Sequence, residues 1–382
     1  MGSFKVKDIP DNYFFTKPVY LDSGFIVAVP EMKFSGELKN LLQEWKFTEV
    51  QSDGEPGEEY EPDDDGGSAE AGASLDGQSL NERKRLQDAE AACQAFQEYT
   101  ESVYTRLAQN IPVPYLEIAE KIKGLCELLK EERRYLLWAL QKTGSPEGQN
   151  YLAIHSVKST IMSLLIGGQL KLPAHRLIEL GAAALVHEAG MSLIPPAIYL
   201  KGQELSEEER KLIFIHPIKS YEILKNSGFP PEVCRAVLEH HERENGAGYP
   251  KKLTGDKISQ YAKIIAAACS FEAQTGSRSY KEAKDGHTGM LDLLKNSGKQ
   301  YDEAIIRALV FSLSIYPIGQ YVLLSNGKKG QVVDTNPENP RLPIVRIFGE
   351  MLPGGRMKTV KTSPDGISIS RPLSQEEIDS VP

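Results

Sequence analysis

The longest continuous pattern in this sequence is a helical hydrophobic period that runs from about residue 80 to about residue 316. Apolar residues recur there every three or four positions, and Gly and Pro interrupt the pattern at intervals. Prolines at 112 and 114 end a first long helix, and the segment TGSPEGQN at 143–150 ends the next helical stretch. The chain is therefore predicted to fold mainly into α-helices.

Both flanks of this helical part have a different pattern. Near the N-terminus, PVYLDSGFIVAVP predicts two short strands around a turn at residues 22–24. The following FSGELKNLLQEWKF predicts a helix with Ser35 as its N-cap. After residue 316 the hydrophobic period falls to two, so YVLLSNGKKGQVVDTN predicts a hairpin turning at Asn326-Gly327, and LPIVRIF predicts a third strand.

The net charge of −9 comes from one segment of the chain. Residues 51–78 hold ten acidic residues and no basic residue, so the remaining residues sum to +1. This segment is rich in Gly and nearly free of large aliphatic side chains, which predicts a disordered linker; a partner-binding acidic tract is the alternative. Because the other residues are balanced in charge, polymeric nucleic acid is not expected as a partner.

A chain of 382 residues is long enough for two or three domains, and the patterns predict where these are divided. The predicted parts are a small N-terminal α/β module at 1–50, the acidic linker at 51–78, a helical connector at 79–145, an all-helical domain at 146–316 and a C-terminal β-hairpin extension at 317–382.

The sequence also indicates a compartment. No apolar run approaches the ~20 residues that span a bilayer, and the N-terminus lacks a signal-peptide core, so membrane insertion is not expected. The four cysteines are far apart and show neither a Cys-x-x-Cys pair nor the spacing of a disulfide framework. A reducing cytoplasm is the expected location.

Histidine is concentrated in one part of the helical region. Of seven histidines, six lie between residues 155 and 241, and five of these stand in an apolar helical context: His155, His187, His216, His240 and His241. A single histidine on an apolar face is usually a core residue with one hydrogen-bond partner. Burying five imidazoles needs five partners, and a shared metal centre supplies one partner for all of them. The carboxylate of Glu188, next to His187, is able to bridge two cations.

The order His187-Glu188, His216 and HHERENGAGYP at 240–250 resembles the HD-GYP family, a branch of the HD phosphohydrolase superfamily. Most characterised members of that family open cyclic di-GMP. The resemblance covers roughly residues 145–316, and the segments on both sides are similar to a small module and a β tail that often flank such domains. It implies an all-helical HD-type metal-binding domain at 146–316, in a bacterial signalling protein.

Position by position, the resemblance also implies a site. The implied metal ligands are His155, His187, Glu188, His216, His240, His241 and Cys269. They imply two divalent transition-metal ions (iron, manganese or zinc), with Glu188 and His187 as the catalytic pair. Gly248, Tyr249 and Pro250 are expected to shape the nucleotide pocket. Arg278 and Lys281 are expected to contact substrate phosphates, with solvated surface charges as the alternative.

Three positions depart from the family pattern. Glu188 replaces the aspartate of the His-Asp signature and is one methylene longer, whereas two metal ions tolerate little displacement of a bridging acid. Met191 replaces a lysine, which removes a positive charge near the scissile phosphate. Cys269 replaces an aspartate and favours zinc or iron, unless it is only a buried small hydrophobe. Tyr151 stands where some members have a glutamate for a third ion, so two ions are expected.

Two functions are therefore weighed against each other, and hydrolysis of another phosphoester is a third possibility. The first is a metal-dependent cyclic di-GMP phosphodiesterase, slowed by the altered positions. The second is a catalytically impaired receptor for cyclic di-GMP or a related cyclic dinucleotide. The five histidines and the Gly-Tyr-Pro sequence favour the enzyme, whereas Met191 and Cys269 favour the receptor. The helix predicted at 80–108 either pairs two chains into a homodimer or packs on its own domain.

Overall fold

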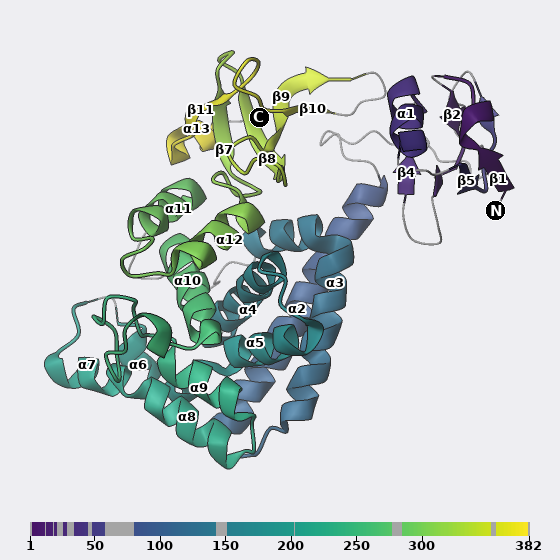
Figure 1. Ribbon diagram of the computed structural model, residues 1–382. Helices are drawn as coiled ribbons and strands as arrows, with labels where there is room; N and C mark the ends of the chain where they lie inside the picture. Colours follow the sequence, from purple (N-terminus) through teal and green to yellow (C-terminus); the bar gives the residue numbers. More distant parts are fainter. Residues whose placement is uncertain are drawn as a thin grey trace. The chain divides into compact units, whose positions relative to one another are not determined.

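The computed structural model describes most of the chain (Figure 1). The described residues are 2–11, 13–17, 19–20, 26–28, 34–44, 48–57, 80–142, 151–201, 203–276, 285–352 and 357–380. The chain divides into two compact units, Met1–Gly72 and Ala73–Pro382.

The first unit is a small α/β module. Its main sheet is antiparallel, with the strand order β1 (Gly2–Lys5), β5 (Glu49–Ser52), β3 (Val19–Tyr20) and β4 (Ile26–Ala28). The other elements are η1 (Val6–Asp8), α1 (Gly36–Glu44) and the strand pair β2 (Phe14–Phe15) with β6 (Pro56–Gly57). The Ser35 hydroxyl accepts a hydrogen bond from the Leu38 backbone N–H at 3.2 Å, so the predicted N-cap is confirmed. The predicted turn at 22–24 lies outside the described residues.

The module continues past the boundary predicted at residue 50. Strand β5 reaches Ser52, which pairs with Gly2, and β6 follows at Pro56–Gly57. Residues 49–52 alternate between exposed and buried side chains, and the acidic composition of the neighbouring residues hid this short alternation. The predicted acidic linker at 51–78 therefore began too early, and its residues 58–78 lie outside the described residues.

The second unit begins with two long helices that lie side by side, α2 (Leu80–Ala108) and α3 (Tyr115–Lys142) (Figure 1). Helix α2 ends before the prolines, as predicted. It packs against α3 and also against α4 (Tyr151–Gln169), and it buries Ala89, Val103 and Leu107 in the common core. This face of α2 is thus used within the chain, and a homodimer stays a prediction.

Helix α4 lies at the centre of the helical domain and is buried along almost its whole length. It contacts α2, α5, α10 and α12. The elements after α4 are α5 (Ala174–Val186), η2 (Ala189–Leu193), α6 (Pro196–Tyr199), α7 (Glu207–Phe214), α8 (His216–Asn226), α9 (Pro231–Glu239), η3 (Gly255–Lys257), α10 (Gln260–Thr275), α11 (Gly286–Lys295) and α12 (Glu303–Leu313). The predicted mainly α class with a small α/β module and a β extension is confirmed. No helix in the described ranges is both long and apolar enough to cross a membrane.

The C-terminal part forms a five-stranded antiparallel sheet in the order β10-β9-β8-β7-β11. Its elements are β7 (Tyr321–Leu324), β8 (Lys329–Asp334), β9 (Ile344–Met351), β10 (Met357–Lys361), β11 (Ile369–Pro372) and the short helix α13 (Gln375–Asp379). The hairpin predicted at Asn326-Gly327 is confirmed, because β7 pairs with β8 and Gly327 has a φ of 78°. Two further strands enlarge the predicted extension.

Candidate metal centre

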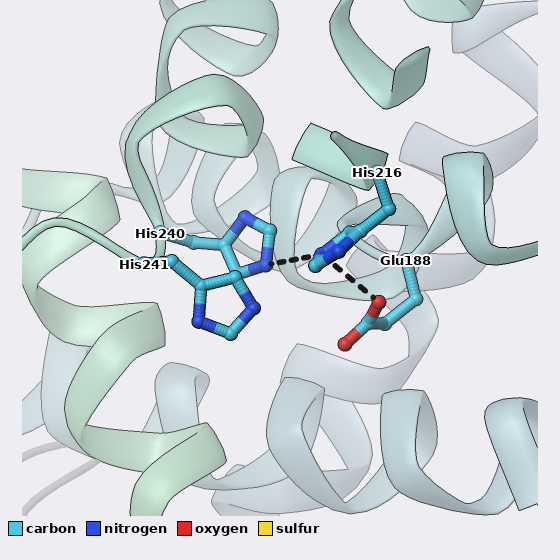
Figure 2. A group of neighbouring side chains, drawn as sticks. All are labelled: Glu188, His216, His240 and His241. Carbon is cyan, nitrogen blue, oxygen red and sulfur yellow. Dashed lines mark hydrogen bonds and ion pairs between the residues drawn. The ribbon is translucent and has the colours of Figure 1, made fainter. Parts of the chain in front are cut away.

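The fold brings all seven predicted metal ligands together from five segments of the helical domain. They come from α4 (His155), the end of α5 (His187 and Glu188), the start of α8 (His216), the end of α9 (His240 and His241) and α10 (Cys269). They form two groups, and the ligand atoms of each group lie within 4.8 Å of one another. The inner group is His155, His187 and Cys269, all buried. The outer group is Glu188, His216, His240 and His241, drawn in Figure 2.

The Glu188 carboxylate faces both groups. Its Oε1 atom lies 3.8 Å from His155 Nε2 and 3.5 Å from His187 Nε2. Its Oε2 atom lies 3.2 Å from His216 Nε2 (Figure 2). Glu188 is thus placed between the two groups despite its extra methylene, as a carboxylate shared by two cations would be.

The imidazoles are oriented with one nitrogen toward the protein and the other toward the centre. His187, His216 and His240 each place Nδ1 at 2.6–2.7 Å from the backbone carbonyl three residues earlier. His155 Nδ1 is hydrogen-bonded to the Glu272 carboxylate. Because a carbonyl oxygen only accepts, Nδ1 of the first three rings carries the hydrogen and Nε2 keeps its lone pair.

The Nε2 atoms of neighbouring rings face one another across short distances. The Nε2 atoms of His155 and His187 are 3.2 Å apart, and so are those of His216 and His240 (Figure 2). Two acceptor nitrogens at this distance repel each other unless a proton or a cation lies between or beside them. The donor set of imidazole, thiol and carboxylate suits a divalent transition metal, so the residues fit the metal that the fold implies.

Burial and neighbouring charges shift the pKa values of these groups in different directions. Burial, together with the other imidazoles, lowers the pKa of His240 and His241 well below that of a free histidine. For His155, burial also lowers the pKa, but the negative charge of Glu272 outweighs burial, so the pKa lies well above the ordinary value. Burial would raise the pKa of Cys269, but the His187 and His155 imidazoles lower it to about 6, which favours the metal-binding thiolate.

A cavity of about 280 Å³ opens onto this centre. Glu188, Met191 and Cys269 line it, so all three departures from the family pattern border the space that a substrate would enter, and Tyr151 lines it too. Arg243 also lines the cavity and donates to the backbone carbonyl of Glu242 at 2.9 Å. The wall of the cavity therefore includes a positively charged side chain, although position 191 does not provide one.

The predicted pocket loop, residues 248–250, lies beside the outer group. The Tyr249 ring stacks on His241 with centroids 4.6 Å apart, and also on Phe214 at 4.6 Å. A Cβ atom at Gly248 would lie 2.5 Å from the backbone of the segment at the end of α9, so glycine alone permits this close approach. Glu242 holds the chain after the loop, because its carboxylate accepts from two backbone N–H groups at 2.6 and 2.9 Å.

The structure does not describe two of the predicted site residues, and two others were missed in the sequence. Arg278 and Lys281 lie outside the described residues, so their role stays a prediction. Glu272 and Arg243 were not predicted. A carboxylate at the position of Glu272 within the apolar stretch AAACSFEA was a usable signal, since a buried carboxylate needs a partner. Arg243 stands inside the quoted motif, and nothing in the sequence distinguishes it from an ordinary solvated charge.

The comparisons with known proteins agree with this geometry. Residues 142–305 match the sequence model of the family described as "HD domain", and this segment contains the histidine cluster. The cyclic di-GMP phosphodiesterase PdeB of Borreliella burgdorferi is 30% identical over 236 residues, which cover 61% of this chain and 62% of that protein. A cyclic di-GMP phosphodiesterase of Pseudomonas aeruginosa is 31% identical over 202 residues, which cover 52% of this chain and 48% of that protein.

The aligned segments cover less than two thirds of either relative's own length. Among solved structures, an HDG"Y"P protein from Bdellovibrio bacteriovorus aligns with a TM-score of 0.49 and 14% identity, over 81% of this chain and 97% of that one. The family match and the relatives confirm the resemblance found in the sequence: residues 142–305 are similar to HD domains, and the chain is similar to proteins named cyclic di-GMP phosphodiesterases.

Proposed function

We propose that this protein hydrolyses a phosphodiester bond of cyclic di-GMP or a related cyclic dinucleotide, with two divalent transition-metal ions bound at the centre. The observation that carries the proposal is the Glu188 carboxylate, which has one oxygen toward the inner group and the other toward the outer group. The names of the relatives, both cyclic di-GMP phosphodiesterases, support the substrate class.

The seven predicted ligands divide between the two ions. His155, His187 and Cys269 would hold one ion, His216, His240 and His241 the other, and Glu188 would contact both. Iron, manganese and zinc all accept such donors. When bound, two ions of this kind activate water for in-line attack and neutralise the negative charge that develops on the phosphate.

The protein itself contributes orientation and charge. The backbone carbonyls and Glu272 hold the imidazole rings so that each Nε2 points at the centre. The Gly248-Tyr249-Pro250 loop forms the wall of the cavity through Tyr249. Arg243 supplies a cation in that wall, and Arg278 and Lys281 are proposed as further contacts to substrate phosphates.

One observation favours the second candidate, a cyclic dinucleotide receptor. Met191 is buried and lines the cavity where the family pattern has a lysine, so the charge that a transition state needs is absent at that position. Ligand binding needs only the cavity and its cations, whereas hydrolysis also needs this stabilisation. A slow enzyme and a receptor thus differ in turnover and not in binding.

The test is to measure metal content, binding and turnover on the same purified protein. The protein is loaded with iron or manganese and incubated with cyclic di-GMP, cyclic di-AMP or cyclic GMP-AMP, and the products are separated by chromatography. A linear dinucleotide that forms only with metal, and not in a His240→Ala, His241→Ala variant, supports hydrolysis. Binding by calorimetry without product supports the receptor. Absence of both binding and turnover contradicts both functions.

A further inference from the structure

The two ligand groups of the proposed centre differ in chemistry and in burial. The inner group offers two imidazoles and the sulfur of Cys269, whereas the outer group offers three imidazoles and a carboxylate. Inner-group residues are 0–9% exposed. In the outer group, Glu188 and His241 are only partly buried. If both groups hold ions, those ions meet different donors and different access to solvent.

Cys269 is placed as a donor and does more than fill the core. Its Sγ atom lies 3.3 Å from His187 Nε2, the nitrogen whose lone pair faces the centre, and the residue lines the cavity. Cys234, another buried cysteine, instead directs its sulfur to a backbone carbonyl at 3.6 Å. Cys93, a residue of α2, lies in the apolar core. Of the four cysteines, all within the described residues, Cys269 is the one found in a group of metal-ligating side chains.

We infer that the centre binds two unlike ions: a zinc or ferrous ion retained by the thiolate of the inner group, and an exchangeable ion, such as manganese, in the outer group. Thiolate selects soft or borderline ions, whereas the outer group has three imidazoles, the shared Glu188 carboxylate and no sulfur, and such donors accept harder ions as well. The Glu272 carboxylate behind His155 strengthens the inner group further, because a charged hydrogen-bond acceptor makes the imidazole a better donor to metal. This inference rests on the metal centre of the proposed function, but not on catalysis.

Cobalt provides a direct test because a cobalt–thiolate bond gives a charge-transfer absorption band in the near ultraviolet. Metal-free full-length protein is titrated with cobalt chloride. The first equivalent should produce the band, and the second should add only weak visible absorption. Cys269→Ser should abolish the band, and Cys234→Ser, a buried control, should keep it. The His240→Ala, His241→Ala variant should keep the band and lose the second equivalent.

A second measurement follows how firmly each metal is retained. Wild-type protein loaded with zinc and manganese is dialysed against a mild chelator, and zinc should remain at about one ion per chain while manganese is lost. Cys269→Asp should lower zinc retention roughly tenfold or more.

Several results would overturn the inference. Cobalt that binds without the band would show that Cys269 is not a ligand. Loss of both metals together on dialysis would show that the two groups are equivalent. Failure to bind any metal would remove the proposed centre itself. Metal binding as inferred without turnover of any cyclic dinucleotide would reject only the enzyme.

Discussion

Replacing Glu272 by Gln should weaken metal binding at the inner group about 10- to 100-fold, which corresponds to roughly 1.4–2.7 kcal/mol. Glu272 is 3% exposed, and its carboxylate is hydrogen-bonded to His155 Nδ1. Glutamine keeps the length of the side chain and an oxygen that can accept the same hydrogen bond. The substitution therefore removes the negative charge behind the imidazole while the ring keeps its orientation.

The assay is a competition for zinc between metal-free protein and a chromophoric chelator. The matched control is Glu239→Gln, because Glu239 is 4% exposed and its carboxylate accepts from Arg235 Nε at 3.0 Å and from the Ser259 backbone at 2.8 Å. This control should lose stability to denaturant but keep its zinc affinity. Equal zinc affinity in wild type and Glu272→Gln, or an equal loss in both variants, would refute the reasoning.

Four further predictions follow from the same contacts. Chelation should lower the melting temperature by several degrees, because paired Nε2 atoms at 3.2 Å then lack a cation; an unchanged thermal transition would contradict this. Met191→Lys should raise the turnover of the cyclic dinucleotide by a factor equivalent to about 2–4 kcal/mol of transition-state stabilisation. Glu188→Asp and Cys269→Asp should raise it further, but the combined effect should differ from the sum of the single effects because all three residues serve one centre. A triple variant that still binds metal and ligand but turns over no faster than wild type would count against this prediction. Glu242→Ala leaves two backbone N–H groups beside the pocket loop without their acceptor, so it should lower the free energy of unfolding by about 1–3 kcal/mol. It should also raise KM more than it lowers kcat. Denaturant titration tests the first effect and steady-state kinetics the second. Deleting 58–79 should leave the melting temperature of the helical part within a few degrees, as calorimetry can check.

What could be predicted from the sequence was mostly local. The hairpin at Asn326-Gly327 and the Ser35 cap depend on residues within a few positions of each other, and both are confirmed. Strand β5 was missed because its four residues are polar or small apart from Val50, and its partner β1 lies at the other end of the module. Pairing between strands that are far apart in the sequence gives little signal in the local residue pattern.

In the candidate site, too, the sequence predicted the residues that have a local signal and missed those that only the fold brings into the site. The histidines were predicted because several imidazoles on apolar helix faces are rare, and the structure brings them together. Glu272 was missed because its partner, His155, is 117 residues away in the sequence. Its apolar context alone does not say which buried group it contacts. Arg243 was missed because a charged residue just after a helix is usually solvated, and only the fold places it in the cavity wall.

The departures from the family pattern are unevenly distributed over the proposed centre, and this bears on how it would work. Cys269 belongs to the inner group and Glu188 is shared, whereas His216, His240 and His241 of the outer group all match the pattern. The outer group is also the one next to Tyr249, which lines the cavity. An ion there would have a family-like environment and solvent access, and an ion in the inner group would be more tightly held. Exchange of the outer ion is therefore expected to change turnover more than exchange of the inner one, because the outer ion lies on the side from which a substrate enters.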